Sequence, residues 1–171
     1  VVGAMTTDQI AALSSSQMGG LSSTQMSALS TTQIQAIETT DLAALTSTQF
    51  GALNTAQIQA LTTAQIGVLN SSAIRSLSTA AVAVLTTDQI DAMSTTQISA
   101  LDTRQVGALN TAQVTAIDTT AIGALSTDGI RALSTAAVAV LGTDQVAALN
   151  TAQVASLSTR QVAVLNTNQV S

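Results

Sequence analysis

The stretch Leu85-Thr-Thr-Asp-Gln-Ile-Asp-Ala92 is one copy of an eight-residue unit that runs through the whole chain. The unit reads Leu-[Ser/Thr/Asn/Asp]-[Ser/Thr]-x-Gln-[Ile/Val]-x-small, and its large aliphatic residue returns every eight positions from Met5 to Leu165. Self-similarity at a fixed short period is typical of repeat architectures. We therefore take this octad as the folding unit.

The second and fifth positions of the octad predict the capped start of a helix. The second residue is Ser, Thr, Asn or Asp in almost every octad, as at Asn54, and these are the preferred N-cap residues; Glu38 is the one poor cap. Gln57, three residues after Asn54, completes a capping box, while Leu53 and Ile58 form the hydrophobic staple around it. Each octad is therefore predicted to form a helix of about six residues that is capped anew at every repeat.

Two other structures for the octad are less favourable. In one continuous helix the Leu stripe would drift by about 80° per octad, so it would never form a fixed seam. In a strand the Leu and Ile/Val positions would point to opposite faces, and no turn residue recurs at a fixed position. Burying the aliphatic pair of one octad contributes roughly 3–6 kcal/mol, whereas ordering eight residues costs about 12 kcal/mol. We therefore predict an all-α solenoid whose short helices are stabilised by stacking.

A longer period of seven octads lies over the short one. Leu77–Val84 recurs unchanged seven octads later at 133–140, and Arg75 and Arg104 map onto Arg131 and Arg160. An odd number of octads per block favours equivalent helices around a screw axis over two alternating layers. Residues 1–171 are predicted to be a single array, and because it begins and ends within an octad we expect it to be a segment of a longer one.

The composition excludes several classes of chemistry. The chain has no His, Cys, Lys, Tyr, Trp or Pro, and charged residues make up 8% of it. It therefore lacks an imidazole base, a thiolate nucleophile, the usual zinc ligands and disulfides. A net charge of −5 has the wrong sign for gripping nucleic acid, and no run approaches the ~20 apolar residues of a membrane span. No catalytic, cofactor-binding or metal-binding residue is predicted, and no cofactor.

Two groups of charged residues are candidates for a binding or catalytic site. The four Arg residues could form a spaced row for a ligand, but their isolated places in variable positions indicate solvated charges. Asp88 and Asp91 have a spacing suited to acid–base chemistry, yet Asp91 corresponds to Ala147 in the next block. The remaining carboxylates are too scattered for a calcium loop. Gln in the octad is interpreted as a cap rather than a ligand, and Phe50 and the Met residues as core.

Two resemblances accompany this interpretation. Leu85–Ala92 resembles the opening of a TAL-effector repeat, in which a similar stretch forms a short capped helix; the base-reading loop, second helix and basic residues of that family are missing here, so DNA binding is not implied. As an array, the chain resembles the Leu-[Ser/Thr]-Thr-x-Gln-[Ile/Val]-x-Ala-Leu tracts of very large secreted bacterial proteins, described as adhesin-like or haem-utilisation-like. That resemblance implies an extended, structural, extracellular role, although no His or Tyr supports the haem description.

The sequence therefore predicts a structural protein without enzymatic activity. We expect an extended extracellular rod or filament, such as the shaft of a secreted surface protein, whose partners are neighbouring repeats or other copies of itself. The alternative is a binding module that presents a regular Thr array, motivated by pairs such as Thr62-Thr63, to ice, a polysaccharide or another repetitive surface.

Overall fold

The computed structural model describes residues 2–169, which form short helices and no strand. Val1, Val170 and Ser171, at the outer ends of the two incomplete octads, lie outside the described residues. The chain divides into two compact units, residues 1–85 and 86–171, and each is described by itself. The prediction of an all-α solenoid of short helices is confirmed in both units. That residues 1–171 form a single array stays a prediction.

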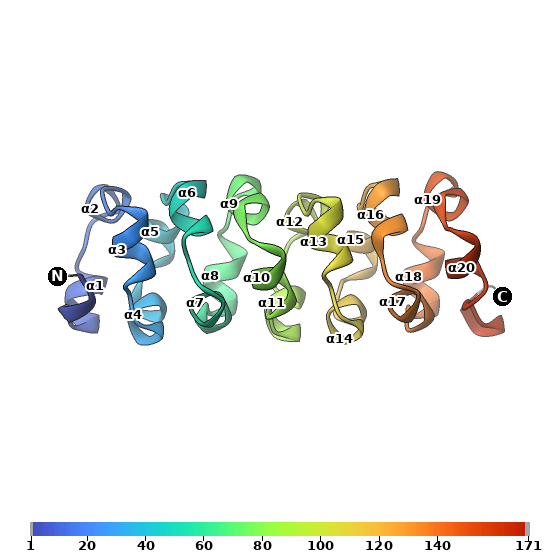
Figure 1. The fold of residues 1–171 in the computed structure, drawn as a ribbon, viewed down its shortest axis with the longest axis horizontal. Helices are drawn as coiled ribbons and strands as arrows, with labels where there is room; N and C mark the ends of the chain where they lie inside the picture. The colour runs from blue at the N-terminus through green and yellow to red at the C-terminus, as the bar shows by residue number, and fades with distance from the viewer. Residues whose placement is uncertain (1, 170–171) are drawn as a thin grey trace. The chain divides into compact units, whose positions relative to one another are not determined.

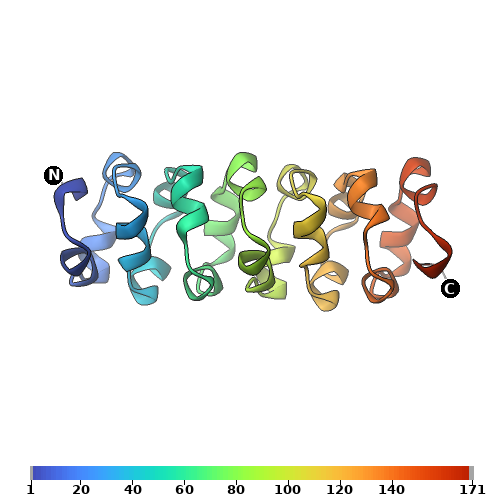
Figure 2. The same cartoon turned by 90° about the horizontal axis from the view of Figure 1, so that it is seen from below.

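Each octad gives one helix, an α-helix of four to six residues or, at η1 and η2, a 3-10 helix of three, and in both units the helices are joined by short connections (Figure 1 and Figure 2). The first unit contains η1 (Val2–Ala4), α1 (Thr7–Ala11), α2 (Ser15–Gly19), α3 (Ser23–Ser27), α4 (Thr31–Ala36), α5 (Thr39–Ala43), α6 (Ser47–Gly51), α7 (Thr55–Ala60), α8 (Thr63–Gly67), α9 (Ser71–Ser76) and α10 (Thr79–Ala83). The second unit contains α11 (Thr87–Asp91), α12 (Thr95–Ser99), α13 (Thr103–Gly107), α14 (Thr111–Thr115), α15 (Thr119–Gly123), α16 (Thr127–Ala132), α17 (Thr135–Ala139), α18 (Thr143–Ala147), α19 (Thr151–Ser156), α20 (Thr159–Val162) and η2 (Thr167–Gln169).

The helices begin as the capping pattern predicts. Asn54 is extended, with φ −79° and ψ 168°, and its side chain accepts a hydrogen bond from the backbone N–H of Gln57 at 3.0 Å. The Gln57 side-chain oxygen in turn accepts from the backbone N–H of Asn54 at 2.8 Å. Glu38 makes no side-chain cap hydrogen bond, as expected of a poor cap, and Gly142 has no side chain with which to make one. Side-chain caps therefore define most of the helix starts.

The helices end without a left-handed residue. No described residue has a positive φ. After α7 the chain passes through Leu61 and Thr62, which are both extended, and the Leu61 N–H donates to the carbonyl oxygen of Ile58 at 3.2 Å. After the six-residue helices, as after α7, two extended residues redirect the chain, and after the five-residue helices a right-handed C-cap residue such as Ala12 comes first. Neither connection needs a glycine at a fixed position.

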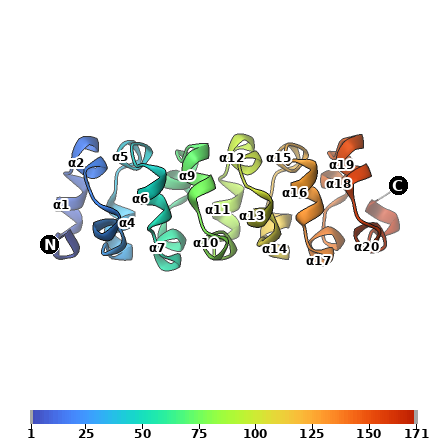
Figure 3. The same ribbon diagram turned by 45° about the horizontal axis from the view of Figure 1, so that its top comes forward.

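Within each unit, the substantial contacts between helices all join helices that are three octads apart. In the first unit α1 packs on α4, and α4 packs on α7; in the second, α13 packs on α16 and α16 on α19 (Figure 3). Three octads therefore complete one turn of the solenoid, and the helices form three columns. This arrangement of equivalent helices is the one favoured by the seven-octad block, rather than two alternating layers.

The core consists of the aliphatic positions of the octad. Side chains in the Ile/Val position are almost fully enclosed, as Ile58 at 0% and Ile66 at 1% exposure show, and the Leu position is buried beside them. Met18, Met26 and Phe50 are buried in the Ile/Val position, so their interpretation as core residues is confirmed. Stacked turns supply the cover that an isolated octad lacks.

Small residues permit the close approach of stacked helices. A Cβ atom at Gly123 in α15 would lie 2.7 Å from the carbonyl oxygen of Ala148, which follows α18. No side chain fits at that distance, so α15 and α18 approach as closely as they do because position 123 is glycine.

Candidate functional site

The most regular polar feature of the structure is the glutamine of the octad. Gln57 is 1% exposed, and its Oε1 atom accepts the N–H of the N-cap residue Asn54. Its Nε2 atom donates to the carbonyl oxygens of Met26 at 2.9 Å and of Leu29 at 2.7 Å. Met26 lies in α3, four helices before α7, and Leu29 lies in the connection that follows α3. We call this pair of interactions, from one N-cap to the end of an earlier helix, the glutamine link.

The link recurs in both units, and each time it joins a glutamine to carbonyl groups between three and four octads earlier. The other links within a unit join Gln33 to Val2 and Met5, Gln49 to Met18, Gly19 and Leu21, Gln65 to Ile34, Gln35 and Ile37, Gln145 to Val114 and Ile117, Gln153 to Gly123 and Leu125, Gln161 to Ile130, Arg131 and Leu133, and Gln169 to Val138, Ala139 and Leu141.

The chemistry of the link explains why the position holds glutamine. The last four carbonyl groups of a helix have no hydrogen-bond partner within that helix. In helices of four to six residues, these are most of the carbonyl groups. A carboxamide offers an acceptor to the N-cap and two donor hydrogens to those carbonyls. Glutamate would complete the capping box equally well, but an ionised carboxylate has no hydrogen to donate. The interpretation of Gln as a cap is thus confirmed, while its second role was missed; the signal was that Glu never occupies this position.

Six octads lack this glutamine. Five of them carry a small residue instead: Ala73, Ala81, Ala121, Gly129 and Ala137. The sixth carries Asp41, which is 4% exposed and accepts a hydrogen bond from the Ser15 hydroxyl at 2.6 Å. The helix columns continue through these octads, so the link is not required for a helix to form.

Hydroxyl groups at the first helical position lie next to the helix one turn further on. Thr95 in α12 and Thr120 in α15 place their hydroxyl oxygens 3.5 Å apart, and the Thr143 hydroxyl donates to the carbonyl oxygen of Asn168 at 3.1 Å. These contacts give a partial reason for the prevalence of Thr and Ser at this position.

The Arg residues of the second unit do not repeat at one octad position along one column: Arg104 and Arg131 lie on the stacked helices α13 and α16 but at the fourth and seventh octad positions. All four Arg residues of the chain are exposed. Within the second unit, Arg104 lies on α13 and Arg160 on α20, which belong to different columns. Seven octads are not a whole number of three-octad turns, so residues repeated by the block necessarily fall on different faces. The interpretation of these residues as separate solvated charges fits this placement.

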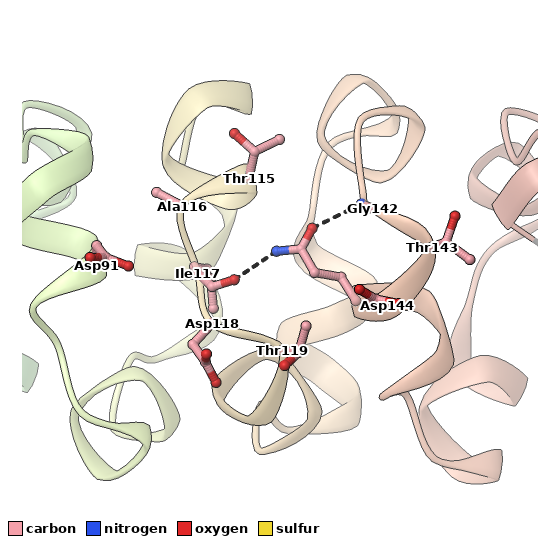
Figure 4. A pocket seen from close by; sticks show the side chains of 10 residues that line it. Asp91, Thr115, Ala116, Ile117, Asp118, Thr119, Gly142, Thr143 and Asp144 are labelled. Atoms are coloured by element: carbon pink, nitrogen blue, oxygen red, sulfur yellow. Dashed lines mark hydrogen bonds between the residues drawn. The ribbon is translucent and has the colours of Figure 1, made fainter.

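An open hollow lies on the second unit (Figure 4). Its volume is about 550 Å³, and it is lined by the carboxylates of Asp91, Asp118 and Asp144 together with Thr and backbone groups. The hydroxyl and backbone N–H of Thr120 donate to Asp118 and lower the pKa of that exposed carboxyl. Asp88 does not line the hollow, so the Asp88–Asp91 pair is not assembled around it. No group of His, Cys, Asp or Glu in residues 2–169 has an arrangement that could hold a metal ion.

Figure 4 also shows how the glutamine link passes beside this hollow: the Gln145 side chain accepts from Gly142 and donates to Ile117.

A model of a repeat family matches residues 2–31, 34–71, 66–95, 90–119, 114–151 and 147–171. The chain belongs to the ALTTAQ repeat family. Among curated proteins, none matches the chain.

The letters of the ALTTAQ repeat occur in the chain at 60–65, and four of the six residues have a structural role that the contacts show. Ala60 ends α7, Leu61 fills the core and redirects the chain, Thr62 caps α8, and Gln65 makes a glutamine link. The family therefore defines a repeat protein by the residues that build its fold. None of the helices in the described part of the ALTTAQ array is long and apolar enough to span a membrane.

Proposed function

We propose that this ALTTAQ array is a structural spacer without enzymatic activity, which forms an extended extracellular rod or filament such as the shaft of a secreted surface protein. The observation that carries the proposal is the recurrence of one set of contacts in both units. Helices stack three octads apart, and the glutamine links keep the same separations along the sequence from one octad to the next. An array held together in this way is lengthened by adding octads, without new kinds of contact.

The distribution of polar groups also supports a spacer. Among residues 2–169, the buried polar side chains other than Asp41 are glutamines of the octad, which serve the fold. The adhesin-like and haem-utilisation-like context, and with it the extracellular location, rests on the resemblance to secreted repeat tracts. Neighbouring repeats and further copies of the chain are the partners expected of such a spacer.

A length series tests this proposal. Variants with one, two or three added copies of a three-octad turn should grow in one dimension by about 8–10 Å per turn, the distance between packed helix axes. Small-angle scattering or electron microscopy measures this dimension. Particles whose dimensions all grow together with chain length, as in a globule, would rule the spacer out.

A second candidate function is a Thr array that binds ice, a polysaccharide or another repetitive surface. The 3.5 Å separation of the Thr95 and Thr120 hydroxyls, on exposed residues of successive turns, favours it. An assay of ice recrystallisation or glycan binding would compare the chain with the variant Thr95→Ala/Thr120→Ala. Activity that is absent from the original chain, or unchanged in the variant, would eliminate this candidate.

A further inference from the structure

A linked glutamine satisfies three backbone groups at once. Gln161 of α20 accepts the N–H of its N-cap residue Ser158 at 2.9 Å. It donates to the carbonyl oxygens of Ile130 at 3.1 Å and of Leu133 at 2.9 Å, in an earlier turn. The side chain is 2% exposed, so its carboxamide lies inside the protein. A linked octad therefore gathers one backbone donor and two backbone acceptors around a buried polar group.

The corresponding backbone groups lack these partners where the glutamine position holds alanine. In α17 this position is Ala137, and the N-cap residue is Ser134. The sequence separations of the link place the Ser134 N–H opposite the carbonyl oxygens of Val106 and Leu109. Within residues 2–169, the Ser134 N–H has no acceptor and the Leu109 carbonyl oxygen has no donor. The Val106 carbonyl oxygen accepts only from the backbone at the end of its own helix.

These groups are enclosed in the same way as those around a linked glutamine. Ala137 and Val106 are 0% exposed, and Leu109 is 4% exposed. Helix α17 stacks on α14 in the column in which α20 stacks on α17, so the turns continue past the alanine. Buried backbone N–H and carbonyl groups are almost always paired, with ordered water where no protein group is in reach. The groups around Ala137 therefore require a partner that is not a side chain of this array.

We propose that each octad with a small residue in the glutamine position binds one buried water molecule. The water accepts from the N-cap N–H and donates to the two carbonyl oxygens of the earlier turn, and so reproduces the three hydrogen bonds of the link. A buried water typically makes about three hydrogen bonds and takes about 30 Å³. Alanine lacks the four outer heavy atoms of glutamine, whose place the water takes. The proposal goes beyond the spacer function and does not rest on it.

The combination of one donor and two acceptors selects water over other small ligands. A metal ion or an ammonium group would bind the two carbonyl oxygens but could not accept from the N–H of Ser134. A carboxylate or a halide ion would accept that N–H but would be repelled by the carbonyl oxygens. Water both accepts and donates, and a bridging water is nearly as favourable in enthalpy as a direct hydrogen bond.

The site recurs in both units. The first unit has it at Ala73 and Ala81, and the second at Ala121, Gly129 and Ala137. In all five octads, the N-cap N–H and the facing carbonyl oxygen in the Leu position have no hydrogen-bond partner within residues 2–169. The three sites of the second unit belong to consecutive helices, α15 to α17. One complete turn of this unit is thus joined to the turn before it through water instead of through glutamine.

A crystal structure that resolves ordered water tests the proposal on the original chain. One water molecule is expected within about 3.2 Å of both the Ser134 nitrogen and the Leu109 carbonyl oxygen. Ser158 is the internal control, because the Gln161 side chain occupies the equivalent place beside its N–H. Absence of a water beside Ser134 and Leu109, in a structure that shows ordered water elsewhere, would overturn the proposal.

Variants test the same site in solution. Oxygen-17 relaxation dispersion counts the water molecules that a protein holds for long times. Ala137→Gln should lower this count by one because its carboxamide displaces the water, whereas Ala136→Gln, at the exposed neighbouring position, should leave it unchanged. The converse variant Gln153→Ala should raise the count by one. An unchanged count in either Ala137→Gln or Gln153→Ala, with helical circular dichroism retained, would show that the turns close around alanine and would overturn the proposal.

Discussion

Two neighbouring groups of three helices in the second unit differ in one residue position. Helices α18 to α20 carry Gln145, Gln153 and Gln161, which link back to α14, α15 and α16. Helices α15 to α17 carry two alanines and a glycine there. Both groups stack in the same way, each helix on the one three octads earlier.

The comparison separates what forms a helix from what ties the turns together. The Ser134 hydroxyl of α17 accepts from the N–H of Ala137 at 3.1 Å, and the Ser158 hydroxyl of α20 accepts from Gln161 at 3.3 Å. Capping is therefore maintained without glutamine, and so is the aliphatic core. The Oε1 acceptor of the N-cap N–H and the hydrogen bonds between turns are lost, so α15 to α17 should be the less stable group although its helices are equally regular.

Replacing a linked glutamine by glutamate should destabilise the array most. Gln153→Glu removes two donors and places a carboxylate against the carbonyl oxygens of Gly123 and Leu125, which should cost about 3 kcal/mol at pH 7 in urea unfolding. Burial and the facing carbonyls raise the pKa of this Glu above its unfolded value of about 4.3. The deficit should therefore be small below that pH and grow as the pH rises through the folded-state value.

The control for this prediction is the same change where the link is absent. Gln25→Glu lies in an exposed first-turn helix and should alter the free energy of unfolding by less than about 0.5 kcal/mol. Equal losses in Gln25→Glu and Gln153→Glu would mean that the link contributes nothing beyond the cap.

Restoring a glutamine to the unlinked group should have a smaller effect of opposite sign. In Ala137→Gln, the new Oε1 would accept from the Ser134 N–H, and Nε2 would donate to the carbonyls of Val106 and Leu109. After the loss of side-chain entropy, a gain of about 1 kcal/mol is expected in the same unfolding measurement. Ala136→Gln, at the exposed neighbouring position, should leave stability within about 0.5 kcal/mol. Destabilisation by Ala137→Gln would show that the unlinked turns are spaced differently.

The smallest effect is expected at the cap of α5. In this octad Glu38 stands in the N-cap position and Asp41 in the glutamine position. Glu38→Ser should supply the missing cap hydrogen bond but remove a negative charge from a helix start, for a net gain of roughly 0.5 kcal/mol. Glu38→Gln removes the charge without adding a good cap and should give no gain. Local hydrogen exchange in α5 measures both variants, and equal protection in the two would show that the serine does not act as a cap.

The local part of the fold was predictable because it is encoded within one octad. Asn54, Gln57 and Ile58 specify the cap, the box and the staple at separations of three and four residues, and these interactions require no knowledge of the neighbouring turns. The class of fold followed because one octad buries too little apolar surface to be stable alone.

The three-octad turn and the glutamine link were not predictable in the same way. They depend on contacts between groups three to four octads apart, which the octad pattern does not specify. The sequence indicated the link only through the absence of Glu three residues after the N-cap, because the capping box by itself accepts either Glu or Gln there. The placement of Arg104 and Arg160 on different columns likewise follows only once seven octads are divided by three per turn.

The most direct test of the glutamine link is the hydrogen exchange of the glutamine side-chain amides, followed by nuclear magnetic resonance. The Nε2 hydrogens of Gln145, Gln153 and Gln161 should be protected by their bonds to carbonyl oxygens, whereas those of Gln17 and Gln25 should exchange as freely as in a peptide. Equal exchange rates in the two groups would contradict the account, because they would show that these side chains cap their own helices and tie no turns together.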